Sequence, residues 1–273
     1  MRPARILIIA GSDAGGGAGI QADIKTVTAL GGYAMTAITA LTAQNTVGVQ
    51  GVRGVEPAFI REQMRSVLDD LGADCIKTGM LHDAAVIDAV VGELDAHATG
   101  APLVVDPVMV AQSGDRLVAE EAMTHLRDVL IPHARLITPN IPEAEALLGR
   151  PLEGAEAMPA AAEALLELGC GAVLLKGGHL AGEMLEDVLA TRRGVTHLRH
   201  ARISTTSDHG TGCTLASAIA EGIGRGLDLE AAVQRGRDYL QQALETAVAL
   251  GHGHGPVNHG HTVMPFGLTP STR

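Results

Sequence analysis

His209-Gly210-Thr211-Gly212-Cys213 is followed directly by Thr214-Leu215-Ala216-Ser217-Ala218-Ile219-Ala220, so a glycine turn leads into an apolar run. Leu215, Ile219 and Ile223 fall four residues apart, the spacing that places side chains on one face of a helix. A glycine turn at a helix start offers unpaired N–H groups and the positive end of the helix dipole. The stretch therefore predicts an anion site on the backbone of residues 210–213. The alternative is a buried start to a core helix, with glycines that serve packing alone.

Cys213 falls in the first turn of this predicted helix. The same positive field that attracts an anion also favours a thiolate over a thiol. A free thiol titrates near ~8.5, and we expect the helix end to lower the pKa of Cys213.

The composition fits an α/β protein. The chain has 273 residues, 46% of them hydrophobic, with 34 glycines for tight turns between strands and helices. No linker marks a boundary, so we expect one domain over residues 1–273. A net charge of −11 and only 1% aromatic residues argue against nucleic acid or an anionic membrane surface as a partner.

The cysteine pattern predicts a reducing compartment. Cysteines stand at positions 75, 170 and 213, and their spacings match no zinc motif. The apolar run Ile6–Ala10 is too short for a signal peptide, and no run approaches the ~20 residues of a membrane span. We expect a cytoplasmic protein that does not associate with a membrane.

Predicted strands and helices alternate along the chain at least six times. The strands are expected at residues 5–10, 35–44, 74–78, 103–109, 135–138 and 172–179, and the longest helix at 229–250. This alternation is typical of a parallel sheet in an α/β fold. An eight-fold barrel is the competing architecture. The late anion turn and a β-rich segment at 183–203 favour an open three-layer sandwich.

Polar residues stand where four of these strands end, the edge at which ligands bind in open α/β folds. Gln44 offers a donor and an acceptor that can pair with a ring nitrogen beside an amino group, or it caps a loop. Asp106 is a candidate for a metal or phosphate site, or a structural cap. Asn140 and Glu143, three apart, could serve one site or form a capping pair. Lys176 can lie over phosphates as a point charge.

Three loops add further expectations. The glycine-rich loop at 11–19 fails both the dinucleotide and the Walker spacing, yet suggests close approach to a ligand. The polar segment 111–116 could be a mobile flap. The tail at 251–261 carries four histidines that could bind a metal; a glycine-laced tail folded over the sheet is the simpler account.

Taken together, seven motifs resemble the hydroxymethylpyrimidine/phosphomethylpyrimidine kinases, in order and over nearly the whole chain. The matching segments are Ala10-Gly11-Ser12-Asp13 with Gly16–Asp23, Thr39–Thr46, Lys77-Thr78-Gly79-Met80, Asp106-Pro107-Val108-Met109, Thr138–Glu143, Leu175–His179 and His209–Cys213. The resemblance implies a ribokinase-like three-layer α/β/α sandwich. It also implies transfer of the ATP γ-phosphoryl group to an aminopyrimidine and then to its monophosphate, in thiamine synthesis.

The resemblance also implies roles for single residues. Gln44 and Asp23 would hold the aminopyrimidine in a pocket lined by Gly11 and Met80. Asn140 and Glu143, with Asp106 through water, would place Mg²⁺, and Lys176 would lie near the phosphates of ATP. The backbone at Gly210, Thr211 and Gly212 would form the anion hole, and Cys213 takes the position of the aspartate base of most related sugar kinases. Relatives are commonly dimers, so a homodimer is expected.

The sequence departs from the family pattern at two positions, and three alternative functions are compared with it. Ala14 replaces a serine often found in the first glycine loop, and Asp208 adds a negative charge near the expected phosphate site. A pyridoxal or pyridoxine kinase is the nearest alternative, although a phenolic pyridine pairs poorly with Gln44. A sugar kinase is disfavoured by Cys213. A non-catalytic pyrimidine-binding protein is disfavoured by the presence of Lys176 and the glycine turn.

Overall fold

One mixed β-sheet runs through the computed structural model, which describes residues 2–97, 100–109, 120–178, 180, 182–264 and 266–267. Within these residues nine strands are hydrogen-bonded in the order β3-β2-β1-β4-β5-β6-β7-β8-β9. They are β1 (Arg5–Asp13), β2 (Tyr33–Asn45), β3 (Gly48–Gly54), β4 (Cys75–Thr78), β5 (Leu103–Val105), β6 (Leu136–Ile137), β7 (Ala172–Leu175), β8 (Met184–Thr191) and β9 (Gly194–Ala201).

The middle of the sheet is parallel and both its ends are antiparallel. Neighbouring strands from β2 through β7 pair in parallel, whereas β3 pairs antiparallel with β2. Beyond β7, strands β8 and β9 form an antiparallel hairpin. Parallel strands end at a common edge, so the loops that follow β1, β4, β5, β6 and β7 gather there.

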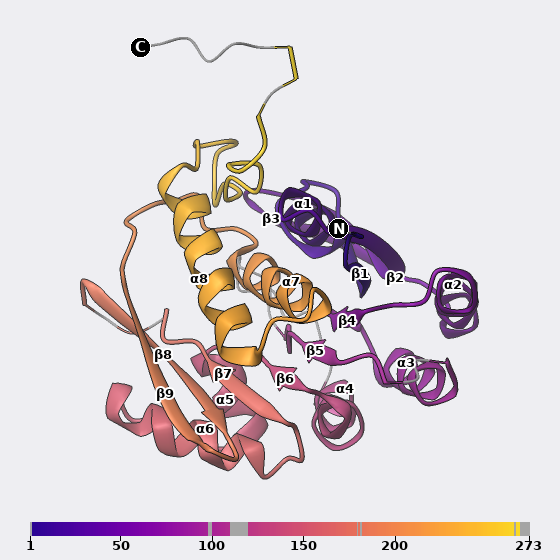
Figure 1. Cartoon of the computed structure of the whole chain (residues 1–273), viewed down its shortest axis with the longest axis horizontal. Helices are drawn as coiled ribbons and strands as arrows, with labels where there is room; N and C mark the ends of the chain where they lie inside the picture. The colour runs from indigo at the N-terminus through magenta and orange to yellow at the C-terminus, as the bar shows by residue number, and fades with distance from the viewer. Residues whose placement is uncertain are drawn as a thin grey trace.

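Helices cover both faces of the sheet (Figure 1). Two separate clusters of buried apolar side chains lie on the two faces. One face carries α1 (Gly19–Ala29), α7 (Thr211–Gly224) and α8 (Leu229–Glu245). The other carries α2 (Pro57–Asp70), α3 (Ala84–His97), α4 (Glu120–His125), α5 (Ile141–Leu148) and α6 (Met158–Leu166), with a π-helical turn at Leu126–Leu130 and 3-10 turns at Ile131–His133 and Ala155–Ala157.

Strand β1 shows how the sequence builds both layers. Ile6 and Ile8 pack into the cluster beneath α1, α7 and α8, while Leu7 and Ile9 pack into the opposite one. Successive side chains of a strand point to opposite faces, so a continuous apolar run is required when both faces are covered. The predicted three-layer α/β fold with a mostly parallel sheet is thereby confirmed, and the barrel is excluded.

One strand and the ends of several elements differ from the sequence-based expectation; the strand expected at 103–109, for example, ends at Val105. Strand β3 was not predicted, because its sequence Gly-Val-Gln-Gly-Val-Arg-Gly has few residues that favour strands and it lies at the edge of the sheet. Helix α8 ends at Glu245 rather than at residue 250. Val248 and Leu250 continue the apolar spacing of the helix but are exposed, so no burial stabilises a longer helix there. The expected flap at 111–116 lies outside the described residues.

The glycine- and histidine-rich tail folds back over the turn between β2 and β3. The N–H of His254 donates to the Thr46 carbonyl (2.8 Å), and the N–H of His209 donates to the Gly255 carbonyl (3.0 Å). Among the described residues no group of three His, Cys, Asp or Glu side chains could hold a metal ion. The simpler of the two accounts of the tail therefore agrees with the structure.

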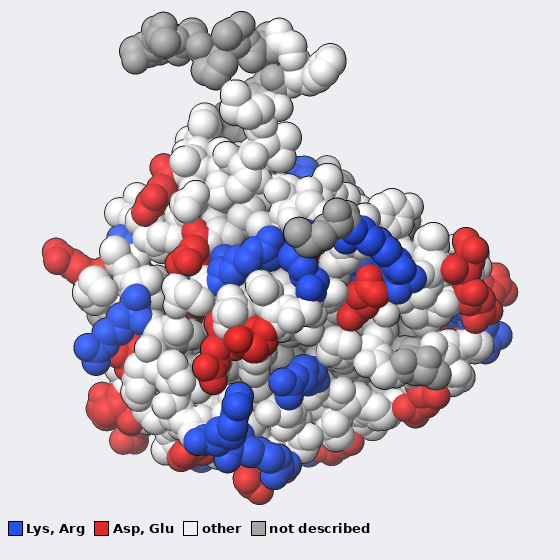
Figure 2. Space-filling model, in the orientation of Figure 1, with Lys and Arg blue, Asp and Glu red and all other residues white. Residues whose placement is uncertain are grey.

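Charged side chains are spread over the surface, and basic and acidic groups lie side by side on the face shown in Figure 2. Arg225 and Arg235, for example, both form ion pairs with the buried carboxylate of Glu221. In the described part of the chain no helix is both long enough and apolar enough to cross a membrane.

Candidate active site

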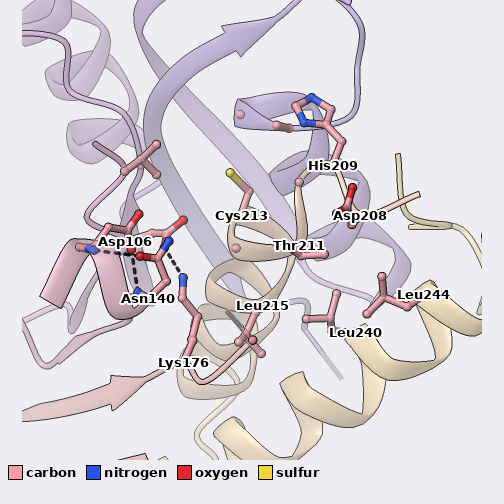
Figure 3. Close-up of a pocket in the computed structure, with 18 of the residues that line it drawn as sticks. Asp106, Asn140, Lys176, Asp208, His209, Thr211, Cys213, Leu215, Leu240 and Leu244 are labelled. Atoms are coloured by element: carbon pink, nitrogen blue, oxygen red, sulfur yellow. Dashed lines mark hydrogen bonds and ion pairs between the residues drawn. The ribbon is translucent and has the colours of Figure 1, made fainter. Parts of the chain in front are cut away.

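A cavity of about 840 Å³ opens at the carboxyl ends of the parallel strands, beside the start of α7 (Figure 3). Its wall includes all but one of the side chains and backbone segments predicted to form the site. They are Gly11, Gln44, Met80, Asp106, Asn140, Glu143, Lys176, Gly210, Thr211, Gly212 and Cys213. Asp23 is the exception.

The glycine turn before α7 has the geometry that its sequence predicts. Gly210 is the N-cap of α7 and has a φ of 84°, a conformation that favours glycine. Among the described residues, no side-chain hydrogen bond caps this helix end. A Cβ on Gly210 would collide with the carbonyl oxygen of Gly17, and a Cβ on Gly212 would lie 3.4 Å from Lys176 Nζ. The start of α7 thus lies against the first glycine loop on one side and a lysine on the other.

Lys176 and Asp106 form the charged floor of the cavity. Lys176 Nζ lies 3.3 Å from Asp106 Oδ1, which also accepts a hydrogen bond from Thr138 Oγ1 (3.0 Å). Asp106 is 2% exposed. Burial lowers the pKa of Lys176, but the carboxylates of Asp106 and Glu143 raise it by more, so the pKa lies above its usual value. The lysine is therefore held as a cation beside the N-terminus of α7.

Asn140 and Glu143 form a capping box at the start of α5, one of the two roles left open by their spacing. Asn140 Oδ1 accepts from the N–H of Glu143 (2.9 Å), and Glu143 Oε2 accepts from the N–H of Asn140 (2.8 Å). Burial raises the pKa of Glu143 to about 7, against the opposing charge of Lys176. Both side chains also line the cavity, so the capping pair lies at the predicted site.

The oxygen atoms of Asp106, Asn140 and Glu143 are ligands of the kind that Mg²⁺ prefers. This ion is usually held by one or two carboxylates together with substrate phosphates and water, rather than by a complete cage of protein ligands. Two carboxylates beside a lysine and a helix N-terminus fit that pattern.

Cys213 lies on the cavity wall and is half-buried, but its predicted activation is wrong. Burial raises the pKa of its thiol to about 12. The ammonium of Lys77 lowers it, whereas the carboxylates of Asp23 and Asp106 raise it further. Desolvation is the largest of these effects, and the thiol is neutral near pH 7.

Asp23 is a correction to the predicted binding residues. Its carboxylate is completely buried behind the cavity wall, where it accepts from Lys77 Nζ (3.0 and 3.1 Å) and from Ser217 Oγ (2.6 Å). Lys77 is also fully buried. A carboxylate enclosed by an ion pair and a hydroxyl has no face left for a ligand, so Asp23 supports the wall from behind.

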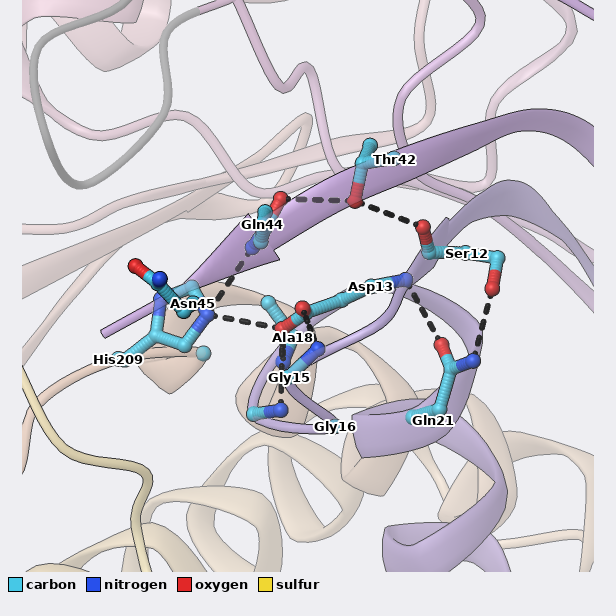
Figure 4. A network of polar contacts seen from close by, with 12 residues as sticks. Ser12, Asp13, Gly15, Gly16, Ala18, Gln21, Thr42, Gln44, Asn45 and His209 are labelled. Atoms are coloured by element: carbon cyan, nitrogen blue, oxygen red, sulfur yellow. Dashed lines mark hydrogen bonds and ion pairs between the residues drawn. The ribbon is translucent and has the colours of Figure 1, made fainter. Parts of the chain in front are cut away.

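Gln44 lies near the end of β2 and lines the cavity, and its side chain belongs to the network of polar contacts shown in Figure 4. Its amide lies 3.1 Å from Thr42 Oγ1, and Thr42 Oγ1 lies 3.0 Å from the Ser12 carbonyl. Met80 also lines the cavity. A Cβ on Gly11 would approach the terminal methyl carbon Cε of Met80 to 2.7 Å, so Met80 would have to shift if any other residue stood at position 11.

Asp13 and His209 are site residues to which sequence reasoning gave no role. Asp13 accepts from the N–H groups of Gly15 (2.7 Å), Gly17 (3.0 Å) and Ala18 (2.8 Å), so the first glycine loop wraps around a carboxylate. His209 Nε2 lies 2.9 Å from Asp13 Oδ2. An acidic residue between a strand and a run of glycines was the available signal.

The two departures from the family pattern differ in their position relative to the cavity. Ala14 is exposed and is not part of the cavity wall. Asp208 lines the cavity, but its Oδ1 lies 2.7 Å from Nδ1 of His254 in the folded-back tail.

The site and the fold together define an α/β protein with an anion-binding turn, a lysine and acidic residues at the carboxyl edge of its sheet. The family model described as phosphomethylpyrimidine kinase matches residues 13–258. The chain belongs to this family.

The chain is also similar to individual proteins of known name. A thiamine biosynthesis bifunctional protein of Geobacter sulfurreducens is 48% identical over 93% of this chain, which spans about half (52%) of that longer protein. The hydroxymethylpyrimidine/phosphomethylpyrimidine kinase of Escherichia coli is 46% identical over 96% of this chain and 99% of its own length. The structure of an ADP complex of Bacillus subtilis pyridoxal kinase superposes with a TM-score of 0.87, at 33% identity over 94% of this chain and 97% of that one.

Proposed function

We propose that the protein transfers the γ-phosphoryl group of ATP to 4-amino-5-hydroxymethyl-2-methylpyrimidine and then to the resulting monophosphate. One observation carries this proposal. The Gln44 amide, the Cys213 thiol, the glycine turn and Lys176 all face a single cavity. A ring with adjacent acceptor and donor groups fits one end, and a phosphate chain fits the other.

The cavity supports phosphoryl transfer mainly through positioning and charge. Gln44, Met80 and Gly11 bind the pyrimidine, while Leu215, Leu240 and Leu244 give an apolar wall at the start of α7 and along α8 for the nucleotide (Figure 3). The N–H groups of the glycine turn and the ammonium of Lys176 stabilise negative charge on the transferred group. Because its thiol is neutral, Cys213 does not act as a pre-formed thiolate. It orients the acceptor hydroxyl by a hydrogen bond.

Mg²⁺ belongs to the same proposal. When bound with ATP, it would neutralise charge on the phosphates, and Asp106, Asn140 and Glu143 would hold it. Release of the proton from Glu143, whose pKa is about 7, would accompany binding of the cation.

A pyridoxal kinase is the second candidate, since the similar structure from Bacillus subtilis carries that name. Gln44 favours the aminopyrimidine, because an amide pairs with a ring nitrogen beside an amino group. We also propose that residues 1–273 act as one kinase domain in a cytoplasmic homodimer.

The test measures ATP consumption with three acceptors side by side: hydroxymethylpyrimidine, its monophosphate and pyridoxal. We expect turnover of both pyrimidines and little with pyridoxal. Cys213→Ala should lower turnover of the pyrimidines by about 100-fold or more while ATP·Mg²⁺ still binds. Turnover of pyridoxal alone would contradict the proposal. No turnover with any of the three acceptors would also contradict it and would favour a non-catalytic pyrimidine-binding protein.

A further inference from the structure

A chain of polar contacts joins the first glycine loop to the expected pyrimidine end of the cavity (Figure 4). His209 Nε2 lies 2.9 Å from Asp13 Oδ2 and 3.2 Å from Gln44 Nε2. On its other side, the Gln44 amide lies 3.1 Å from Thr42 Oγ1. The amide of Gln44 is thus held between an imidazole and a hydroxyl, and each of these has a further partner.

The proton on His209 is fixed by Asp13. Burial raises the pKa of Asp13, but His209 and the backbone N–H groups of Ala18 and Gly15 together lower it by more, so this carboxylate is ionised and only accepts. The ring nitrogen at 2.9 Å must therefore carry a hydrogen and donate it to Asp13. A nitrogen that already bears a hydrogen cannot accept one from the Gln44 amide.

The hydroxyl of Thr42 leads independently to the same conclusion about the orientation of the Gln44 amide. It has one hydrogen and lies within hydrogen-bond distance of both the Ser12 carbonyl (3.0 Å) and the Gln44 amide (3.1 Å). The carbonyl only accepts, so the hydrogen goes there and the oxygen of Thr42 is left to accept from Gln44. A half-turn about the last side-chain torsion of Gln44, which is two-fold, turns its nitrogen toward the oxygen of Thr42 and its oxygen toward the N–H of His209. That N–H then serves Asp13 and Gln44 together as a three-centre hydrogen bond, with Asp13 the nearer acceptor.

We propose that His209, held by Asp13, is a positioning residue that fixes the Gln44 amide with its oxygen toward the imidazole and its nitrogen toward Thr42. The inference rests on the proposed function and deepens it. A bound ring must then present its acceptor on the Thr42 side and its donor on the His209 side. An aminopyrimidine has this order when its ring nitrogen faces Thr42 and its amino group faces His209. A ring with N–H beside C=O has the reverse order and is rejected.

The test compares binding of 4-amino-5-hydroxymethyl-2-methylpyrimidine with that of its 4-oxo analogue, by calorimetry. We expect the wild-type protein to prefer the amino compound by about 100-fold or more, because the reversed order leaves polar groups unpaired. His209→Leu frees the amide to turn. The preference should then fall to about tenfold or less, and affinity for the amino compound by about tenfold, while affinity for ATP·Mg²⁺ stays within about twofold.

Further variants separate this role from simple damage. His209→Gln keeps an N–H donor and should restore most of the preference. Thr42→Val removes the contact on the other side of the Gln44 amide. It should reduce the preference for the amino compound as His209→Leu does. His197→Leu is the matched control, because His197 pairs with Glu186 on the surface of β8 and β9, outside the cavity wall.

The outcomes are distinct. An undiminished preference in both His209→Leu and Thr42→Val would overturn the inference and leave the proposed function intact. Equal losses of affinity for ATP and for both pyrimidines would also overturn it, because they would show a structural role only. A wild-type protein that binds neither pyrimidine would overturn the proposed function and this inference with it.

Discussion

In the folded protein, burial of the Glu143 side chain disfavours its charged form. Its pKa rises from 4.5 to about 7 because burial disfavours the carboxylate, although Lys176 partly offsets this. A group whose pKa is higher in the folded than in the unfolded protein stabilises the fold when it is protonated. That contribution is complete below about pH 4.5 and is lost as the pH rises through about 7.

Replacing Glu143 by Gln should therefore stabilise the ligand-free protein at pH 8. The expected gain is up to about 3 kcal/mol, since one pKa unit corresponds to about 1.4 kcal/mol, and glutamine keeps the capping box. At pH 4 the two proteins should unfold at nearly the same temperature, because Glu143 is then protonated in the folded and the unfolded protein alike. Thermal unfolding at both pH values measures this, with the exposed Glu163→Gln as control. A variant that is less stable than the wild type at pH 8 would contradict the account.

Single residues also show where sequence reasoning stops. Gln44, Asp106 and Lys176 could be placed at the cavity because each follows a strand, and parallel strands end at one edge. Cys213 and Asp23 could not be assigned correctly, because their behaviour depends on burial and on Lys77, which is 54 residues from Asp23. The role of His209 likewise depends on partners 165 and 196 residues away.

At the scale of elements, the start of α7 depends on contact between two glycine turns. Gly210 caps the helix and faces the carbonyl of Gly17. Gly226, two residues beyond the helix end, has a similar φ of 93°, but a Cβ there would meet nothing within 4 Å. The two positions share the backbone conformation and differ only in their surroundings.

Gly210→Ala should therefore lower the stability and the turnover of the protein far more than Gly226→Ala. The second change adds only the strain of a left-handed residue, about 1 kcal/mol. The first adds the collision with Gly17, which must push the two turns apart, so a loss of stability several-fold larger is expected together with loss of turnover. Thermal unfolding and the kinase assay measure both effects. Equal effects of the two substitutions would show that the contact between the turns is unimportant.

Whole helices and strands were predicted better than their ends. The alternation of apolar strands and helices predicts that the central strands run parallel, because each crossover helix returns the chain to the same edge of the sheet. The edge strand β3 and the end of α8 depend instead on weak, solvent-exposed contacts that leave little pattern in the sequence.

For the whole molecule, a buried ion pair ties together elements on both sides of the cavity wall. Lys77 comes from β4, Asp23 from α1 and the hydroxyl of Ser217 from α7, and all three are completely buried. Burial lowers the pKa of Lys77, but the neighbouring Asp23, Cys213 and Asp106 together raise it by more, so the pKa lies above its usual value and the ammonium stays charged beside Asp23. Removing one partner leaves an uncompensated charge in the interior.

Lys77→Met should therefore destabilise the protein by about 3–5 kcal/mol. The double change Lys77→Met with Asp23→Asn should be milder, because no unpaired charge remains. The midpoint of thermal unfolding measures the difference. If the double variant were no more stable than Lys77→Met alone, the pair would not be what holds this part of the wall.

The central claim is that this cavity phosphorylates a hydroxymethylpyrimidine, and ³¹P NMR of one reaction tests it most directly. The protein is mixed with ATP, Mg²⁺ and 4-amino-5-hydroxymethyl-2-methylpyrimidine, with the Lys176→Met variant in parallel. The account predicts a phosphomonoester signal, then the paired signals of a diphosphate ester as ATP becomes ADP, both strongly reduced in the variant. Unchanged ATP, or ADP with free phosphate and no ester of the pyrimidine, would contradict it.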